Sequence, residues 1–401
     1  MRVALLTREY PPDVYGGAGV HVEYLARELA RAADVTVHCW GSERPQVPGG
    51  PAVVAHRPWD ALAGPEPYAA ALQAFSIDLT MAAGAAGADL VHSHTWYANL
   101  GGHLAKLVHG ISHVATVHSL EPMRPWKREQ LGGGYALSGF AERTALEAAD
   151  AVIAVSAAHL GEILTCYPAV DPARTSVIYN GIDADEYRPD RGTDVLARHG
   201  IDPARPSVVF VGRITRQKGL AHLLDAAPMI DPAAQLVLCA GAPDTPELAA
   251  EIATKLESVR SARGSVIWIE EMLPKPDLIQ ILSHATVFVC PSVYEPMGIV
   301  NLEAMACEAA VVATAVGGIP EVVEDGVTGL LVPYDAEPDG TGTPVDPAGM
   351  AAALAARVDE LLADPARAEA MGRAGRARAI ARFGWDVAAA ETLALYERLL
   401  G

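Results

Sequence analysis

The sequence has little cysteine and no cysteine pattern typical of a metal site. It contains five cysteines in 401 residues, and no two of them form a CxxC pair. Most lie in or beside apolar segments, where a reduced thiol behaves as a small apolar side chain. We therefore expect free thiols, with neither a disulfide framework nor a zinc site. The five are Cys39, Cys166, Cys239, Cys290 and Cys307.

The chain also lacks a long apolar run. The first run, residues 3–6, is shorter than the apolar part of a secretory signal. No stretch approaches the ~20 apolar residues that span a membrane. A net charge of −19 argues against a nucleic-acid-binding surface, so any anion site must be a local basic pocket. These absences predict a cytoplasmic protein that binds neither membranes nor nucleic acid. Its oligomeric state stays open, and a homodimer is one option.

Two nucleotide-binding fingerprints are missing as well. After the first expected strand, residues 15–20 read YGGAGV, which is not GxGxxG. After the seventh, residues 212–219 read GRITRQKG, again without that pattern. A GxxxxGK[ST] sequence is also absent. The chain is therefore predicted to be neither an NAD-dependent dehydrogenase nor a P-loop protein.

The sequence does contain two successive series of strand-like runs that alternate with helical patterns. A turn signal at Asn180-Gly181 and a polar connector separate them. This alternation predicts an α/β protein with two doubly wound, Rossmann-like domains that face each other across a cleft. Residues 42–67 and 335–347 are predicted surface loops, and 385–400 a terminal helix. The expected strands are 3–7, 35–39, 89–93, 113–117, 151–155, 176–179, 207–212, 235–240, 265–269, 286–290, 310–314 and 330–332.

Residues 291–307, PSVYEPMGIVNLEAMAC, form the stretch around which we expect the chemistry to be organised. They follow a buried strand and pass into a helix, the position where α/β proteins bind ligands. Glu295 stands in the loop and Glu303 in the helix. With a rise of ~1.5 Å per residue, Glu303 lies only about a turn and a half inside the helix. Both carboxylates can then reach one ligand. Either alone would be explained equally well as a capping or solvated acid.

A second loop carries cations between a strand end and a helix that begins near Gly219. Arg213 and Lys218 both lie in it. Two cations at the mouth of a parallel sheet, in an acidic protein, suit a diphosphate. The alternative is a solvated loop in which these side chains and Arg216 are all exposed. Gly212 and Gly219 bracket the loop, as close backbone approaches would require.

Two features in the N-terminal half are also candidates for ligand binding. Gly16 and Gly17 precede a helix that begins near Gly19, and such a loop can approach a phosphate, although glycine pairs are also common in turns. His118 ends the fourth expected strand and is predicted to face the cleft. A purely structural hydrogen-bonding role is the alternative for this histidine.

Together these motifs resemble the retaining glycosyltransferases of the GT-B fold, in the glycogen synthase branch. More narrowly, the chain resembles the actinobacterial α-maltose-1-phosphate synthases. The stretches that carry this likeness are TREYPPDVYGGAGVHV, VHSHTWY, HSLEPMRPWKREQLGGGY, VGRITRQKG and PSVYEPMGIVNLEAMAC. The resemblance implies a hexosyltransferase of glycogen synthesis that moves glucose from ADP-glucose to glucose-1-phosphate, and to α-1,4-glucan ends. The product would be α-maltose-1-phosphate, formed with retained configuration and without a cofactor or metal.

The resemblance also implies a role for each motif residue. Arg213 and Lys218 would neutralise the departing phosphate, where charge develops in the transition state. Glu295 would hold a hydroxyl of the donor sugar and Glu303 the ribose hydroxyls. His118 would line the donor sugar. Further donor contacts would come from Gly16, Gly17, Gly298, Ile299 and Val300.

The same resemblance implies three segments and leaves alternatives open. Residues 1–183 would form the acceptor-side domain, 184–380 the nucleotide-sugar domain, and 381–401 a helix returning to the first domain. The runner-up is a UDP-sugar-dependent GT-B enzyme that acts on an inositol phosphate. A GT-B-like sugar-nucleotide epimerase and a non-catalytic glucan-binding protein are weaker alternatives. Neither the base of the donor nor the acceptor is fixed by the pattern.

The segment after His118 predicts the acceptor. It carries three cations within five residues, which suit a phosphate monoester, and a tryptophan that can stack on a sugar. A neutral glucan end would offer the cations nothing to pair with, so we expect glucose-1-phosphate to be preferred. The alternative is a solvated loop whose cations are neutralised by Glu121 and Glu129. The candidate acceptor contacts are Arg124, Trp126, Lys127 and Arg128.

Overall fold

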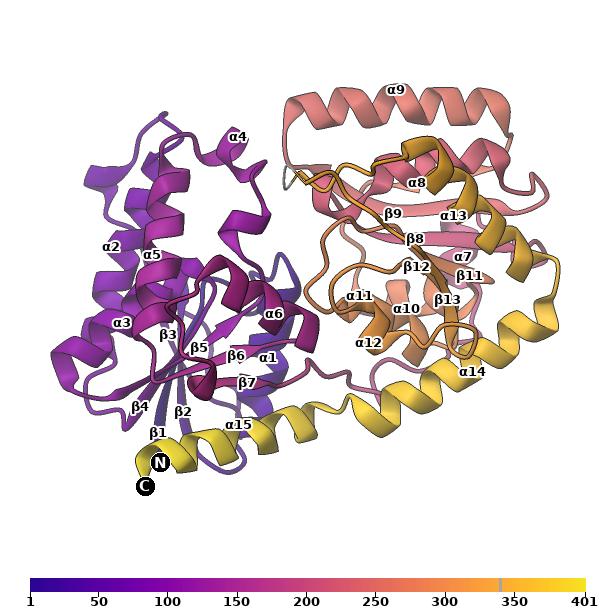
Figure 1. Cartoon of the computed structure of the whole chain (residues 1–401). Helices are drawn as coiled ribbons and strands as arrows, with labels where there is room; N and C mark the ends of the chain where they lie inside the picture. The colour runs from indigo at the N-terminus through magenta and orange to yellow at the C-terminus, as the bar shows by residue number, and fades with distance from the viewer. Residues whose placement is uncertain (339–340) are drawn as a thin grey trace. The chain divides into compact units, whose positions relative to one another are not determined.

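The computed structural model describes residues 1–338 and 341–401. The chain divides into two compact units. Unit 1 comprises Met1–Gly181 together with Trp385–Gly401, and unit 2 comprises Ile182–Gly384. The boundaries expected from the sequence were 183/184 and 380/381. Figure 1 shows the elements of both units in chain order.

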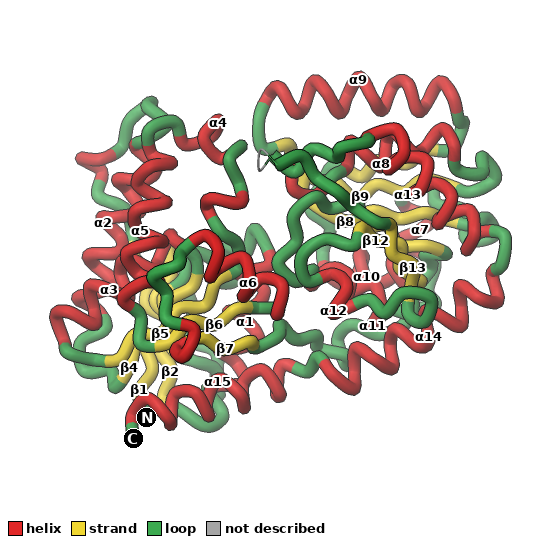
Figure 2. The backbone as a smooth tube through the Cα atoms, in the orientation of Figure 1, coloured by secondary structure: helices red, strands yellow, loops and turns green. Residues whose placement is uncertain are grey.

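Unit 1 is built on a seven-stranded parallel sheet with the order β3-β2-β1-β4-β5-β6-β7. Helices lie on both sides of these strands (Figure 2). The strands are β1 Arg2–Leu6, β2 Asp34–Trp40, β3 Ala52–His56, β4 Leu90–His94, β5 Ser112–Val117, β6 Ala151–Ala154 and β7 Thr175–Val177. The α-helices are α1 Gly17–Leu29, α2 Ala69–Gly84, α3 Trp96–His109, α4 Lys127–Leu131, α5 Gly134–Ala148, α6 Ala157–Cys166 and α15 Trp385–Leu400. Short 3-10 turns occupy η1 Asp60–Leu62, η2 Glu121–Met123 and η3 Pro172–Arg174.

The central strand β1 shows why the helices cover both faces. Its side chains alternate between the two faces of the sheet, and all of them are apolar after Arg2. Val3 and Leu5 pack in one core with α1 and α15, whereas Ala4 and Leu6 pack in another with α2 and α3. The last helix of the chain is therefore part of the hydrophobic core of unit 1.

Unit 2 is built on a six-stranded parallel sheet with the order β10-β9-β8-β11-β12-β13. The strands are β8 Ser207–Ile214, β9 Gln235–Pro243, β10 Val266–Ile269, β11 Val287–Cys290, β12 Ala310–Thr314 and β13 Gly329–Val332. Its α-helices are α7 Asp194–Arg198, α8 Leu220–Ala226, α9 Pro246–Ala262, α10 Lys275–Ser283, α11 Ile299–Ala306, α12 Ile319–Val322, α13 Pro347–Leu362 and α14 Pro365–Arg382. The 3-10 turns are η4 Arg216–Lys218 and η5 Ala227–Met229.

The strands β11 and β12 are buried along their whole length. Such continuous apolar strands are typical of a parallel sheet that is covered on both faces. Helices α8 and α13 belong to the same core as these strands. The burial keeps the sheet rigid, so the loops at the strand ends are held at fixed positions.

One expected loop contains a strand. Residues 42–67 were predicted to be a surface loop, but Ala52–His56 forms β3 and pairs with β2. Glycine and proline at positions 48–51, directly before the strand, are typical of a loop, and the strand was therefore missed. As an edge strand, β3 pairs on one side only, and its burial pattern is correspondingly weaker. Of the second predicted loop, 335–347, residues 339–340 lie outside the described residues.

All five cysteines are free, and four of them are buried, as expected from their apolar surroundings. Among residues 1–338 and 341–401, no helix has both the length and the apolar character needed to cross a membrane.

Candidate active site

In unit 2, the loops that carry the predicted donor residues meet at one point of the sheet. Strands β8 and β11 are neighbours, and the strand order reverses between them. Open parallel sheets bind ligands at such a switch point, beyond the carboxyl ends of the strands. Lys218 follows β8 and Glu295 follows β11. The topology therefore brings these two residues together although 76 positions lie between them in the sequence.

Lys218 and Glu295 form a direct ion pair. The distance from Lys218 Nζ to Glu295 Oε2 is 2.5 Å, and their side chains are only 20% and 8% exposed. Burial alone would lower the pKa of Lys218, but the charge of Glu295 and its hydrogen bond outweigh this effect and raise that pKa above its usual value. The ammonium group thus stays charged, with two further hydrogen-bond donors available to a ligand.

The two loops touch through their backbones. Gly219 has a φ of +66°, and a Cβ at this position would lie 1.9 Å from the carbonyl oxygen of Pro291. Val293 N donates a hydrogen bond to Gln217 O at 2.9 Å. A side chain at position 219 would push the loops apart, so the glycine permits the approach of Lys218 to Glu295.

A third loop fixes Glu295 from the other side. Gly318 N donates to Glu295 O at 3.0 Å. Gly317 has a φ of +54°, and its Cβ would lie 2.1 Å from the same oxygen. Ser292 Oγ donates to Glu295 Oε2 at 3.3 Å. The carboxylate is therefore held in place before any ligand binds.

The other predicted side chains of this unit have partners that sequence reasoning missed. Tyr187 donates from its hydroxyl to Glu303 Oε1 at 3.1 Å. Burial raises the pKa of Glu303, and the tyrosine opposes that shift. Arg213 pairs with Asp244 at 3.5 Å. No pattern near Glu303 or Arg213 points to Tyr187 or Asp244, because both partners come from other parts of the chain.

The start of α11 supplies the predicted backbone contacts. Gly298 is the N-cap, with a φ of +92°, and Ile299 and Val300 are the first two helical residues. The first N–H groups of a helix have no intrahelical partner and favour anions. Asn301 lies fully buried beside them, and neither polar atom of its side chain has a partner within the described residues. Asn301 was not predicted, although it lies in the stretch 291–307.

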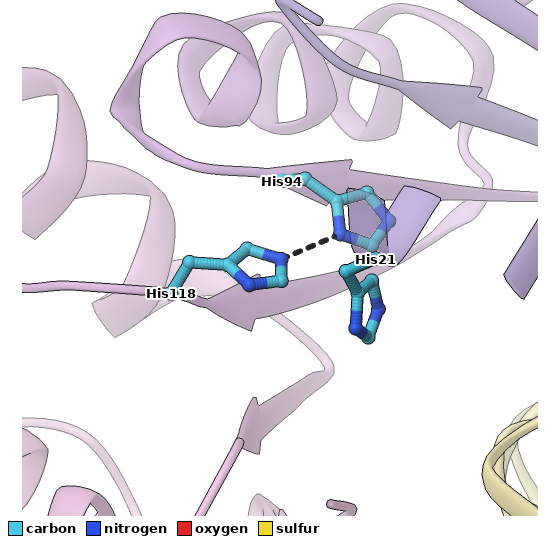
Figure 3. Close-up of side chains that lie close together, drawn as sticks. All are labelled: His21, His94 and His118. Carbon is cyan, nitrogen blue, oxygen red and sulfur yellow. Dashed lines mark hydrogen bonds between the residues drawn. The ribbon is translucent and has the colours of Figure 1, made fainter. Parts of the chain in front are cut away.

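In unit 1, His118 lies directly after β5 and contacts two further histidines. Its Nε2 is 3.1 Å from His94 Nδ1, at the end of β4. Its ring centroid is 4.6 Å from that of His21, which comes from α1. Figure 3 shows the three rings together. Strands β4 and β5 are adjacent, which explains the first contact. His21 and His94 were not predicted.

These imidazoles are neutral near pH 7. Burial lowers the pKa of His21 to about 4, and the hydrogen bond to Asn180 opposes this shift only in part. Burial, together with neighbouring histidines, holds the pKa of His94 and of His118 well below the usual value. His118 therefore acts as a neutral hydrogen-bonding group rather than as a cation.

The glycine loop of unit 1 encloses a carboxylate. Gly16 is the N-cap of α1, and Gly17 is the first helical residue. The amides of Tyr15 and Gly16 donate to Glu9 Oε2 at 2.8 and 2.7 Å. A Cβ on Gly19 would lie 2.8 Å from Glu9, so this glycine makes room for the acid. The anion-binding position beside Gly16 is thus taken by Glu9, which was not predicted.

The predicted acceptor residues separate into different environments. Arg124 pairs with Glu121, which is buried and also accepts a hydrogen bond from Ser138 Oγ at 2.6 Å. Glu142 accepts from the amide of Glu121 at 2.8 Å. Burial and the charge of Glu121 raise the pKa of Glu142. Arg124 therefore belongs to a buried polar network. Trp126 and Lys127 lie at the start of α4, and both side chains are half-buried.

Arg128 lines a pocket. The pocket has a volume of about 870 Å³, and its wall also contains the exposed Arg143 of α5. The guanidinium of Arg128 lies 5.5 Å from the ring centroid of Tyr135. Two arginines and several aromatic rings suit a ligand with an anionic group and an apolar face. The lining residues are Glu121, Pro122, Arg128, Gly132, Gly133, Tyr135, Ala136, Gly139, Phe140, Arg143 and Tyr167.

Comparison with known proteins identifies the family. Residues 205–364 match a family model described as "Glycosyl transferases group 1", and residues 15–186 match "Glycosyltransferase Family 4". The chain is 56% identical to alpha-maltose-1-phosphate synthase from Mycolicibacterium smegmatis over 402 residues, with 100% of both chains covered. The chain belongs to the glycosyltransferase family of the alpha-maltose-1-phosphate synthases.

Other relatives place this glycosyltransferase more broadly. It is 32% identical to D-inositol 3-phosphate glycosyltransferase from Streptomyces bingchenggensis, with 95% of this chain and 84% of the relative covered. A sucrose-phosphate synthase from Thermosynechococcus elongatus superimposes with a TM-score of 0.80 at 26% identity, over 99% and 98% of the two chains. The prediction of a GT-B fold and of a hexosyltransferase is confirmed.

Proposed function

We propose that the enzyme transfers glucose from ADP-glucose to glucose-1-phosphate, forming α-maltose-1-phosphate in glycogen synthesis. One observation carries the donor half of this proposal: the buried ion pair of Lys218 and Glu295 at the switch point of the unit 2 sheet. A charged donor of hydrogen bonds and an acceptor-only carboxylate stand side by side there. The lysine suits the diphosphate of a nucleotide sugar, and the carboxylate suits the hydroxyl groups of its sugar.

The bond that breaks joins the anomeric carbon of glucose to the distal phosphate oxygen. Its electron pair stays on that oxygen, so negative charge grows beside Lys218 and Arg213, whose preorganised charges stabilise it. Glu295 accepts a hydrogen bond from a sugar hydroxyl, and Glu303 accepts from the ribose. The incoming hydroxyl attacks from the face that the nucleotide leaves and passes its proton to the departing phosphate. The configuration at the anomeric carbon is thereby retained, and no metal is needed.

The acceptor half of the proposal is supported by the pocket in unit 1. Glu121 is neutralised by Arg124, so Arg128 and Arg143 give the pocket a net positive character within an acidic protein. Glu121 is three residues from His118 in the chain, so their Cα atoms are at most ~11 Å apart. One wall of the pocket, at Glu121, is thus close to the end of β5. A glucan end, which carries no charge, would gain less from this pocket.

A donor-by-acceptor matrix tests the proposal. ADP-glucose and UDP-glucose are each combined with glucose-1-phosphate, glycogen and inositol 3-phosphate, and release of the nucleoside diphosphate is measured. We expect the highest kcat/KM for ADP-glucose with glucose-1-phosphate, and slower transfer to glycogen. Product analysis should give an α-linked disaccharide phosphate. Preference for UDP-glucose, or for another acceptor, would contradict the proposal.

The likeness to D-inositol 3-phosphate glycosyltransferase favours one alternative, a UDP-sugar donor with an inositol phosphate acceptor. That alternative would use the same basic pocket for a phosphate on a different ring. The matrix separates the two, because only the alternative predicts turnover with inositol 3-phosphate.

A further inference from the structure

The histidine cluster of unit 1 is larger than the proposed reaction requires. The reaction uses His118, but His21 and His94 are buried behind it. One nitrogen from each of the three residues lies within 4.8 Å of the other two. Figure 3 shows the rings gathered at one point, from a helix and from the ends of two adjacent strands. Rigid elements thus hold three nitrogen ligands close together.

The protonation pattern of His21 leaves one ring nitrogen with a free lone pair. Its Nδ1 is 2.7 Å from Asn180 Oδ1, and a carbonyl oxygen can only accept a hydrogen bond. The proton therefore resides on Nδ1, and Nε2 carries the lone pair. That Nε2 is buried and has no hydrogen-bond partner. Histidines that bind metals are oriented in this way, with the second ring nitrogen donating to an oxygen.

The nitrogen of His94 that lies close to His118 is its Nδ1. Its Nδ1 faces His118 Nε2 at 3.1 Å, whereas its Nε2 is buried and unpaired within the described residues. Buried polar atoms are usually paired, so among these three histidines the unpaired His21 Nε2 calls for an explanation. In the neighbouring His92 both ring nitrogens have partners. Its two nitrogens lie 2.5 Å from Tyr396 Oη and 2.7 Å from Thr116 Oγ1.

We propose that His21, His94 and His118 bind one Zn²⁺-like transition-metal ion, and that this ion inhibits the transferase. Neutral imidazoles are ligands for zinc, copper and nickel, whereas calcium and magnesium require oxygen ligands, which this set does not offer. Zn–N bonds of about 2.0–2.1 Å put the nitrogens of a tetrahedral site roughly 3.4 Å apart. The separation between His94 and His118 is already near this value. The His21 nitrogen lies within 4.8 Å of the other two and must move closer to complete the site, and water fills the fourth position.

Metal binding should inhibit the transferase because His118 belongs both to the metal site and to the donor site. A metal ion takes the lone pair of His118 and so removes the group that lines the donor sugar. The nucleotide-binding residues belong to unit 2 and are left unchanged. Metal binding should therefore abolish glucosyl transfer while leaving ADP affinity as it was.

The test begins with the full-length protein treated with a chelator and dialysed. Zn²⁺ is titrated by calorimetry, and Co²⁺ by its visible absorption, which reports nitrogen coordination. We expect one equivalent to bind, glucosyl transfer to fall with occupancy, and EDTA to restore it. ADP affinity, measured in parallel, should not change.

Substitutions show which residues bind the ion. His94→Gln and His21→Gln should abolish stoichiometric binding. Asn180→Ala should weaken it roughly 10–100-fold, as expected for loss of the group that orients a ligand. The control is His38→Gln, because His38 belongs to the other buried histidine pair of unit 1, 3.0 Å from His56. This control should bind Zn²⁺ as the wild type does.

Two results would overturn the inference. One is a wild-type protein that binds no equivalent of Zn²⁺ or Co²⁺, which would mean that water alone satisfies the cluster. The other is stoichiometric binding that survives in both His94→Gln and His21→Gln. If those variants fail to fold by circular dichroism, the wild-type Co²⁺ spectrum decides, since a spectrum of oxygen ligation contradicts the histidine site. Because stoichiometry is measured without turnover, its failure is distinct from failure of the proposed reaction.

Discussion

Lys218 and Arg213 are the residues whose loss should affect turnover most. In the proposed reaction, both Lys218→Ala and Arg213→Ala remove a preorganised charge beside the departing phosphate. We expect each to lower kcat by roughly 10²–10³-fold, with a much smaller change in donor affinity. Steady-state kinetics with ADP-glucose, combined with ADP binding by calorimetry, measures both quantities.

Arg216 in the same loop provides the matched control. It pairs with Glu251 at 3.8 Å, and both side chains are about two-fifths exposed. Arg216→Ala should keep near-wild-type turnover. If all three variants lost activity equally, the loop rather than individual charges would be responsible. If Lys218→Ala kept the wild-type kcat, the proposed role of Lys218 in stabilising the departing phosphate would be refuted.

Single substitutions of Arg143 and Arg128 test the proposed acceptor pocket. Arg143→Gln and Arg128→Gln each remove one positive charge from the unit 1 pocket while keeping a polar side chain. We expect each to raise the KM for glucose-1-phosphate about tenfold, while the kinetics with glycogen change little. The measurement is kcat/KM for both acceptors at fixed ADP-glucose.

Arg124→Gln should behave differently from these two variants. Arg124 is held by Glu121 in the buried network, so its loss leaves a buried carboxylate without its cation. Such a loss typically costs about 3–5 kcal/mol of stability. Thermal unfolding of Arg124→Gln should therefore shift downward, whereas Arg143→Gln should unfold like the wild type. A selective effect of Arg124→Gln on glucose-1-phosphate alone would restore it as an acceptor contact.

At the scale of elements, the site depends on how closely two loops approach. Gly219→Ala places a Cβ within 1.9 Å of the Pro291 carbonyl and also opposes a φ of +66°. The loops after β8 and β11 must then separate, which moves both Lys218 and the proposed nucleotide contacts at the start of α11. We expect both lower stability and at least tenfold weaker ADP binding, measured by thermal unfolding and calorimetry.

Gly200 provides the control for this substitution. Its φ of +70° is nearly the same, but a Cβ there would meet nothing within 4 Å. Gly200→Ala should cost only the strain of a left-handed alanine, ~1–3 kcal/mol, with ADP affinity unchanged. If Gly219→Ala bound ADP as tightly as Gly200→Ala, the close approach would not be what positions the site.

Elements with strong apolar patterns were predicted best. The strands β11 and β12 are continuous buried runs, and the predicted strand 310–314 coincides with Ala310–Thr314. The edge strand β3 was missed because it is short, partly exposed and flanked by turn residues. The start of α11 was found within a residue, since Gly298 marks the cap.

At the scale of the whole molecule, the two units should respond differently to acid. Unit 1, all of whose residues are described, contains nine histidines whose pKa is lowered chiefly by burial. They are His21, His38, His56, His92, His94, His103, His113, His118 and His159. In the described part of unit 2, the lowered histidine is His222. Unfolding of unit 1 at acidic pH should therefore take up more protons than unfolding of unit 2.

The direction follows from linkage. A histidine with a folded pKa below its unfolded value of about 6.5 stabilises the fold above that pH, and this stabilisation is lost as the pH falls. Three buried acids of unit 1 act in the opposite sense, because their pKa is raised, but the histidines outnumber them. The acids are Asp78, Glu142 and Glu162.

We therefore expect the unfolding temperature of unit 1 to fall more steeply than that of unit 2 between pH 6.5 and 5. Scanning calorimetry at several pH values measures this, and the transition that ADP raises is assigned to unit 2. Equal slopes for the two transitions would show that the buried histidines do not control acid stability. A single transition at all pH values would mean that the units unfold together.

The sequence by itself determined the alternation of strands and helices, the motif residues and the likeness to GT-B transferases. These features are local, since hydrophobic period, glycine placement and charge within a loop can be read from neighbouring residues. Only the tertiary structure decided which distant residues meet. It joined Lys218 to Glu295 through the adjacency of β8 and β11, and it buried Glu121, the partner of Arg124, against Ser138 of α5.

The histidine cluster illustrates the same limit. His21, His94 and His118 are separated by more than twenty residues from one another, and each alone reads as an ordinary buried histidine. Their convergence depends on strand order and helix packing, which follow from burial of apolar surface over the whole of unit 1. Sequence patterns fix which faces of an element are apolar, whereas the relative placement of polar side chains at strand ends emerges only once those faces have packed.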